Sequence, residues 1–237
     1  NSSVDYAMLE YCIREDLKLK RPRMMAVLDP IKLVIDNYPE GQVEYLEAPN
    51  NMENEELGTR KIPFSGELYI ERDDFMAEPP KKYKRLYPGN EVRLMNAYFV
   101  TCTGYEADDD GTIRVVHCTY DPETKGGNAP DGRKVKGTIH WVEASNAGKV
   151  EVRLYENIVD EEKGVYNKED GSLNVNPNSL TVTSAYVEPE LLKAKGYDSY
   201  QFVRNGFFCA DIHDSREGAP VFNRIVSLKS SFKLPKA

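Results

Sequence analysis

From Arg23 onward the sequence is divided into short apolar runs separated by turn-forming residues, and this pattern constrains the fold more than any other feature. Val92 to Tyr105 and Thr112 to Tyr120 flank residues 108–111, whose Asp-Asp-Asp-Gly sequence predicts a hairpin turn. Asn205-Gly206 lies between two further apolar runs, and Asn-Gly favours a type I′ turn. Many short strands with frequent turns are typical of small closed barrels or sandwiches. We therefore predict a mainly β chain made of two small barrels.

Two polar segments divide this β-rich region. Pro122 to Asp131 is rich in Gly, Pro and charge, and it predicts a boundary between two β units. Glu161 to Asn178 predicts a long polar loop. Further short strands are expected at residues 24–28, 33–35, 138–142, 150–155, 181–187 and 221–228.

The start of the chain predicts the one clear helix. Apolar residues recur at helical spacing from Ser2 to Lys18, Ser2 and Asp5 resemble a capping box, and Pro22 ends the segment. One amphipathic helix cannot bury its own apolar stripe, so it packs either on the barrels or on a part of the protein outside this sequence. Asn1 is an unusual first residue, and we expect the chain to be a fragment of a longer protein.

No catalytic or metal-binding motif is present. The sequence has neither a GxxxxGK[ST] phosphate loop nor a GxSxG elbow, and the acidic run 108–110 is explained as a solvated turn. The four cysteines are scattered without a CxxC pair and show no zinc-ligand spacing with the three histidines. We expect no metal, and four buried, reduced cysteines in a cytoplasmic protein.

Charge gives a more specific indication. The net charge of −8 argues against a non-specific nucleic-acid binder, but it allows a local basic surface on an acidic body. Residues 81–85 place four cations around Tyr83, and residues 133–136 form a second basic cluster before Trp141. Cations that hold phosphates beside a ring that stacks an unpaired base suit RNA recognition, although exposed strand edges also carry Lys.

Beyond these patterns, the chain resembles the anticodon-binding region of glutaminyl-tRNA synthetases over about 220 residues. The matching segments, in order, are residues 12–17, 22–35, 63–67, 83–86, 89–94, 118–121, 131–142 and 220–224. The resemblance implies two six-stranded β-barrels with exchanged strands, like that of ribosomal protein L25, preceded by a short α-helical connector. It implies a connector at 1–22, a first barrel at 23–122, a second barrel at 137–213, and a C-terminal strand at 214–237 that returns to the anticodon-proximal barrel.

The resemblance also implies roles in reading a tRNA anticodon whose bases are splayed apart. Arg23 and Gln201 match residues that read the central uridine. Lys84 and Arg85 match contacts to the third base, a guanine, and Arg93 matches a residue of the wobble-base pocket. Positions beside the anticodon loop, at its rim or backbone, are matched by Arg204, Lys229 and Ser231.

Two positions depart from the family pattern. Lys82 stands where a Gln is common, next to Tyr83, and Met95 replaces an Arg. Methionine donates no hydrogen bond, so we expect weaker discrimination of cytosine from uracil at the wobble position, or a substitute contact.

The implied partner is glutamine tRNA, with no DNA and no membrane, and a monomer is expected. The parent enzyme would ligate glutamine to tRNA with ATP, whereas this fragment would be non-catalytic and bind no ATP, Mg²⁺ or other cofactor. Three alternatives remain: the equivalent domain of an archaeal or eukaryotic-type glutamyl-tRNA synthetase, a non-catalytic RNA-binding barrel protein, and a β-barrel hydrolase.

Overall fold

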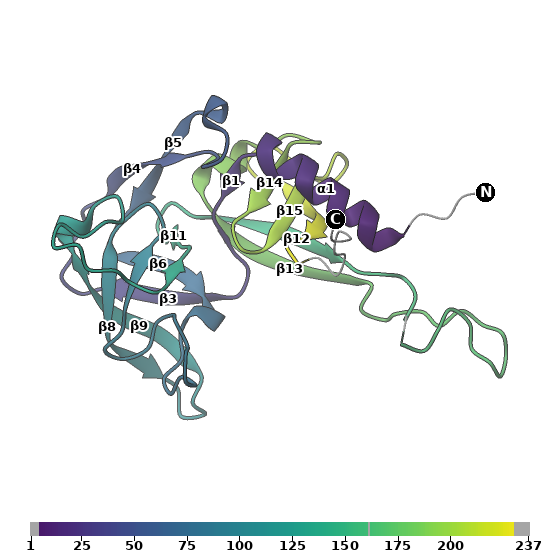
Figure 1. Cartoon of the computed structure of the whole chain (residues 1–237), viewed down its shortest axis with the longest axis horizontal. Coiled ribbons are helices and arrows are strands. Elements are labelled where there is room, and N and C mark those ends of the chain that lie inside the picture. Colours follow the sequence, from purple (N-terminus) through teal and green to yellow (C-terminus); the bar gives the residue numbers. More distant parts are fainter. Residues whose placement is uncertain (1–4, 161, 230–237) are drawn as a thin grey trace, which may run out of the picture.

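Two β-barrels lie side by side, with one helix along the second of them (Figure 1). The computed structural model describes residues 5–160 and 162–229. No helix in this part of the chain is long and apolar enough to cross a membrane. Short 3₁₀ helices occur at η1 (Glu55–Leu57), η2 (Arg72–Asp74), η3 (Pro122–Thr124) and η4 (Pro189–Lys193).

Helix α1 (Tyr6–Lys20) is capped by Asp5, whose carboxylate accepts a hydrogen bond from the N–H of Ala7 at 2.8 Å. The predicted cap residue Ser2 lies outside the described residues. The helix packs on the second barrel through Arg14, which is buried and donates from Nε to the carbonyl of Ser227 at 2.6 Å. Its Tyr6 side chain stays exposed.

The first barrel contains β3 (Pro30–Ile35), β6 (Glu67–Glu71), β7 (Glu91–Leu94), β8 (Phe99–Ala107) and β9 (Ile113–Asp121). A kinked segment closes it: β10 (Thr138–Ile139) pairs with β7, and β11 (Val142–Glu143) pairs with β6. A separate hairpin, β4 (Glu44–Pro49) and β5 (Thr59–Phe64), contributes Leu46 and Phe64 to the same core. The strand expected from Val92 to Tyr105 is interrupted between β7 and β8, where Asn96 has a φ of 59°.

The second barrel contains β12 (Gly148–Tyr155), β13 (Leu180–Val187), β14 (Ser199–Phe202), β15 (Gly206–Ala210) and β16 (Val221–Ser227). Its closing segment comes from the beginning of the chain: β1 (Arg23–Met24) pairs with β14, and β2 (Ala26–Val27) pairs with β13. The last strand, β16, lies between β15 and β12.

The prediction of a mainly β chain with two barrels is confirmed. Each sheet has seven hydrogen-bonded strands in place of the expected six, because each closing segment is kinked into two short strands. The exchange also crosses the expected boundaries. Residues 23–27, assigned to the first barrel, close the second, and residues 138–143, assigned to the second, close the first.

Segment 23–27 serves two cores at once. Met24 and Ala26 belong to the buried cluster of the second barrel, whereas Met25 and Val27 belong to that of the first. Successive side chains of an extended strand point to opposite faces, so one short segment placed between two barrels fills both.

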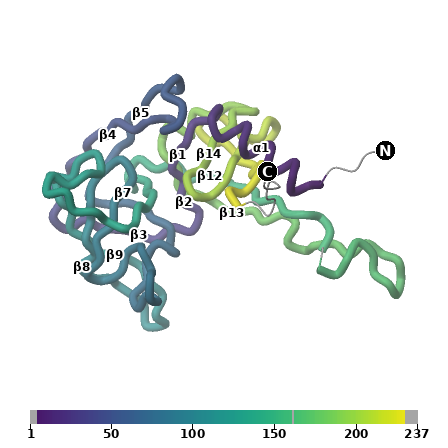
Figure 2. Tube along the Cα trace, viewed as in Figure 1, coloured from purple at the N-terminus to yellow at the C-terminus, as the bar shows by residue number. Residues whose placement is uncertain are grey.

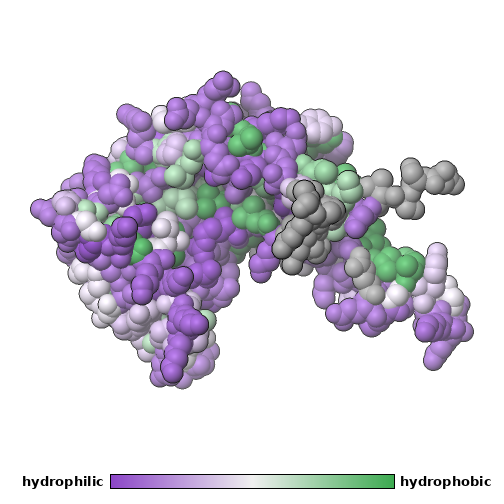
Figure 3. All heavy atoms as spheres, in the orientation of Figure 1, coloured by the Kyte–Doolittle hydropathy of each residue, from purple (hydrophilic) through white to green (hydrophobic). Residues whose placement is uncertain are grey.

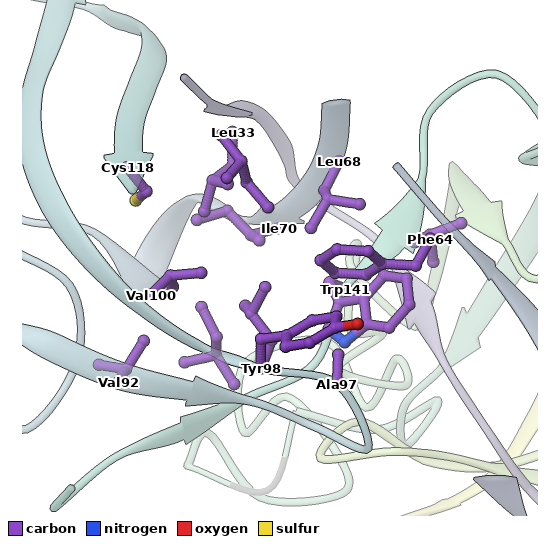
Figure 4. Close-up of a cluster of buried hydrophobic side chains, with 14 of the residues drawn as sticks. Leu33, Phe64, Leu68, Ile70, Val92, Ala97, Tyr98, Val100, Cys118 and Trp141 are labelled. Atoms are coloured by element: carbon purple, nitrogen blue, oxygen red, sulfur yellow. The ribbon is translucent and has the colours of Figure 1, made fainter. Parts of the chain in front are cut away.

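The core of the first barrel surrounds Trp141 and Phe64, which meet edge to face with ring centroids 5.1 Å apart (Figure 4). The indole N–H of Trp141 donates to the carbonyl of Met95 at 2.9 Å, so the buried ring leaves no polar atom unpaired. All four cysteines are free thiols, but the expectation that all four are buried is wrong for Cys12, which is exposed on helix α1, and for Cys209, which is only half-buried.

Of two predicted connections, the turn after β14 differs from expectation and the long polar loop does not. The turn between β14 and β15 spans Val203 to Asn205, with Arg204 rather than Asn205 in the left-handed region at a φ of 64°, so it is not a type I′ Asn-Gly turn. Gly206 is needed instead for packing, because a Cβ there would lie 2.8 Å from the carbonyl oxygen of Val226. The expected polar loop after β12 forms a long arm that extends from the second barrel and exposes Ile158 and Tyr166 (Figure 2).

Candidate nucleic-acid interface

Arg23 and Gln201 lie directly opposite each other on neighbouring strands. They are Cα partners in the parallel pairing of β1 with β14, and the N–H of Gln201 donates to the carbonyl of Pro22 at 2.9 Å. Strand pairing thus sets two polar side chains from opposite ends of the sequence next to each other.

The guanidinium of Arg23 forms an ion pair through one terminal nitrogen, whereas its Nε has no partner among the described residues. Its Nη2 donates to Glu53 at 2.9 Å, and Lys18 contacts the same carboxylate at 3.1 Å. The hydrogen bonds from Arg23 and then Lys18 lower the pKa of Glu53. The Nε of Arg23 is buried without a hydrogen-bond partner among the described residues.

A pocket of about 230 Å³ opens where the two barrels meet. It is lined by Arg23, Met25, Pro49, Met52, Arg60, Met95, Asn96, Gln201, Val203, Arg204 and Leu228. Hydrophobic residues gather near the junction of the barrels on a largely hydrophilic face, with others on the arm (Figure 3). Apolar methionine side chains beside Arg, Asn and Gln donors suit a flat ring with polar edges, as an unstacked base has.

Beside this pocket, two arginines share one buried carboxylate. Arg204 binds Asp74 with both terminal nitrogens, at 2.6 and 2.7 Å, and Arg85 places Nε 3.2 Å from the same group. The side chain of Asp74 is 0% exposed. The hydrogen bond between Arg204 and Asp74 is the main reason that the pKa of Arg204 is raised. Through Asp74, Arg85 in the loop before β7 is joined to Arg204 in the turn after β14, and this contact connects the two barrels.

A histidine and a glutamate extend this connection. His140 places Nε2 3.0 Å from the carbonyl of Ala26 and Nδ1 3.3 Å from Arg204, so an Nε2–H tautomer leaves Nδ1 to accept from the arginine. Burial alone would raise the pKa of Glu71, but hydrogen bonds from His140 and from two backbone N–H groups lower it to about 2. The seam between the barrels is thus a network of paired polar and charged groups around the buried Asp74 and His140.

The two basic clusters seen in the sequence lie against each other. A Cβ on Gly137 would lie 1.8 Å from the carbonyl oxygen of Lys84, so only glycine allows these segments to touch. Lys82 and Lys84 are exposed and make no hydrogen bond or ion pair within the described part of the chain. Tyr83 is held by a hydrogen bond from its hydroxyl to the carbonyl of Asp73 at 2.9 Å.

Comparison with known proteins agrees with this arrangement. The family "tRNA synthetases class I (E and Q), anti-codon binding domain" matches residues 22–121, and a second family model of the same description matches residues 138–211. The chain belongs to this family.

Several curated relatives are about half identical to the chain. Glutamine–tRNA ligase of Clostridium kluyveri is 52% identical over 237 residues, which are 100% of this chain and 43% of the relative. Glutamine–tRNA ligase of Clostridium perfringens is 53% identical over 99% of this chain and 42% of the relative, and that of Pseudomonas putida is 52% identical over 97% and 41%. The chain spans about two fifths of the length of these relatives.

Within this member of the anticodon-binding family, Arg93 lies apart from the pocket. Its guanidinium carbon is 5.4 Å from the centre of the Phe99 ring, and its Nε is buried without a partner among the described residues. Arg133 contacts the same ring at 5.3 Å.

Arg133 is not a free cation of the second basic cluster. It forms ion pairs with Glu91, Asp121 and Asp131 at 3.0, 2.6 and 2.9 Å, and the hydrogen bond to Glu91, followed by those to the two aspartates, raises its pKa. Its charge ties together the loop after β9, which leaves Lys134 and Lys136 as the exposed cations of that cluster.

The remaining predicted positions are less informative. Met95 lines the pocket that Gln201 also lines, and Lys229 is exposed at the end of the described chain. Ser231 lies outside the described residues.

Sequence reasoning missed Asp74, Arg60 and Asn96, all of which line the pocket or hold residues that do. Asn96 could have been suspected as a turn residue with a left-handed backbone. Nothing in the sequence separates Asp74 from its exposed neighbour Asp73.

Proposed function

We propose that this chain recognises the anticodon loop of a tRNA, with Arg23 and Gln201 reading the central base. The observation that carries the proposal is the strand pairing of Arg23 with Gln201 beside the pocket between the barrels. A uracil edge offers two carbonyl acceptors and one N–H donor. Arginine supplies donors, and the glutamine amide both donates and accepts, so the pair complements that edge.

The proposed partner is glutamine tRNA, because the relatives at 52–53% identity carry the name glutamine–tRNA ligase. In the parent protein the chain would serve ATP-dependent ligation of glutamine to tRNA in the cytoplasm. That chemistry, with ATP and Mg²⁺, belongs to the remainder of the protein and not to this chain, which we propose to be non-catalytic and monomeric.

The other readers follow the same chemistry. Guanine offers the O6 and N7 acceptors to Arg or Lys, which suits Lys84 and Arg85 at the third base. Arg93 is proposed for the wobble base. Phosphate contacts are proposed for Lys82, Arg204, Lys229 and Ser231, since such contacts position the RNA without reading its sequence.

The test compares binding of tRNA with a glutamine anticodon and of the same tRNA altered only at its middle base. The unaltered chain should bind the altered tRNA about 1–3 kcal/mol more weakly, as expected for a lost base contact. Arg23→Ala should cost about the same for the glutamine tRNA and remove the preference.

Arg114→Ala is the matched control, because Arg114 is exposed in the β8–β9 hairpin and, among the described residues, forms an ion pair only with Asp108. It should keep the preference for the middle base. If Arg23→Ala and the unaltered chain bind both tRNAs alike, Arg23 does not read that base.

The wobble base gives a second, independent comparison. Because Met95 lacks a donor, we propose that tRNAs with C or U at that position bind with similar affinity. A strong preference abolished by a change elsewhere in the pocket would place wobble recognition on that other residue.

A further inference from the structure

Asp74 is fully buried between two arginines that come from different barrels. Arg204 approaches it with both terminal nitrogens, at 2.6 and 2.7 Å, and Arg85 with Nε at 3.2 Å. The side chains of Arg204 and Arg85 are 28% and 42% exposed, so both arginines remain partly open to solvent while they hold the buried carboxylate. One negative charge therefore holds two positive charges.

The backbone of Asp74 anchors the loop that carries Arg85. Its carbonyl accepts from the N–H of Leu86 at 2.9 Å, and the N–H of Met76 donates to the carbonyl of Leu86 at 3.0 Å. These bonds hold the two ends of the loop 76–86 together, next to Asp74. Arg85 is held again by a hydrogen bond from Nη1 to the carbonyl of Asp73 at 3.2 Å, and no described residue pairs with its Nη2.

On the other side, Asp74 holds a strained turn. Arg204 has a φ of 64°, a conformation that costs a residue with a side chain about 1 kcal/mol or more and persists only where surrounding contacts enforce it. The turn follows directly on β14, which carries Gln201, and Arg204 and Gln201 line the same pocket. The position of the turn therefore bears on the pocket for the middle base.

We propose that Asp74 is a positioning residue that keeps the readers of the middle and third anticodon bases at a fixed spacing, so that the two bases are read as a unit. This rests on the proposed function. Asp74 itself touches no base: it acts through Arg85 for the third base and through the turn at Arg204 for the middle base. Within the described part of the chain, Asp74 is the only side chain that forms an ion pair with both Arg85 and Arg204.

The prediction is a specific pattern of binding. Asp74→Asn removes one negative charge, so affinity for RNA phosphates is kept or rises. Discrimination, by contrast, falls at both bases from this one change. We expect a loss of about tenfold at the third base, within the range of one base contact, and a smaller loss, about threefold, at the middle base. A residue with only a structural role would lower binding of all tRNAs together.

The experiment measures dissociation constants for three tRNAs: one with a glutamine anticodon, one altered at the middle base and one altered at the third. Asp73→Asn is the matched control, since Asp73 is the exposed neighbour and the change in charge is the same. It should keep both discrimination ratios within about twofold. The emission spectrum of Trp141 reports whether each variant is folded.

A folded Asp74→Asn variant that keeps both ratios overturns the proposal, as does one that loses affinity equally for all three tRNAs. If Asp74→Asn does not fold, Arg204→Lys decides, because it keeps the charge but cannot form the two-pronged bond. Arg204→Lys should reduce discrimination at the third base, which Arg204 is not proposed to read; unchanged discrimination there overturns the proposal. If the unaltered chain discriminates neither base, the proposed function itself fails.

Discussion

The two barrels are built alike but differ in how much core each possesses. Among the described residues, the buried cluster of the first barrel has 26 members and that of the second has 12. The first barrel adds the β4–β5 hairpin to its core, whereas the second relies on stacked phenylalanines, with Phe202 and Phe208 centroids 4.2 Å apart. The smaller barrel is therefore expected to depend on its neighbour for stability.

The dependence is built into the closing segment 23–27. Its alternate side chains lie in the two cores, and its first residue, Arg23, is one of the proposed base readers. The proposed RNA-binding side chains of the pocket thus lie where the barrels support each other, not on either barrel alone.

The largest effects should come from the two cores. Phe64→Ala in the first barrel and Phe208→Ala in the second each remove a fully buried ring, at a cost of about 4 kcal/mol. Because segment 23–27 joins the cores, either change should shift a single unfolding transition followed by the fluorescence of Trp141, the one tryptophan. A Trp141 transition unmoved by Phe208→Ala would mean that the barrels unfold independently.

The next test removes a salt bridge between the barrels. Arg60 on β5 contacts Glu188 after β13 through two nitrogens at 2.6 Å, with side chains only 7% and 3% exposed. Arg60→Ala leaves a buried carboxylate unpaired and should lower the free energy of unfolding in urea by about 3 kcal/mol. Arg133→Ala, whose ion pairs lie within the first barrel and near solvent, should cost clearly less. Equal losses would contradict a special role for the contact between barrels.

Acid should weaken the seam through Glu71. Its pKa is about 2 in the folded protein against an ordinary 4.5, so the unfolded chain binds its proton first as pH falls. The stabilisation is therefore complete above pH 4.5 and is lost between about 4.5 and 2, amounting to as much as about 3 kcal/mol. The unaltered chain should lose unfolding free energy between pH 5 and pH 3. The Glu71→Gln variant should lose less over the same range. The same pH dependence in both would place the acid sensitivity elsewhere.

The smallest effect concerns one glycine in each barrel. Gly206→Ala in the second barrel places a Cβ 2.8 Å from the carbonyl oxygen of Val226. It should lower the free energy of unfolding by about 2 kcal/mol, and the melting temperature with it. Gly104→Ala in the first barrel meets nothing within 4 Å and should change stability by less than about 0.5 kcal/mol. A neutral Gly206→Ala would show that the turn after β14 adjusts freely, which would also weaken the argument for a rigid turn at Arg204.

Much of this protein could be predicted from local sequence. The alternation of apolar runs with turns predicted the β class and most strands, and the helical spacing before Pro22 predicted the helix, because these patterns depend on neighbours within a few residues. A series of segments that match the family indicated the family, and with it Arg23 and Gln201 as candidate readers. The resemblance did not indicate which other groups hold those readers in place.

Tertiary structure alone decided which barrel each closing segment completes and which charges are free. Residues 24–27 and 139–143 are buried on both faces, so their pattern fits either core, and only pairing with distant strands assigns them. Asp73 and Asp74 are the same residue type side by side, yet one is exposed and the other is bound to Arg204, 130 positions away. Similarly, Arg133 is paired with three carboxylates, while Lys134 is exposed. The reason is physical: strand and turn preferences are local, whereas the burial and pairing of a charge depend on partners that folding brings from elsewhere in the chain.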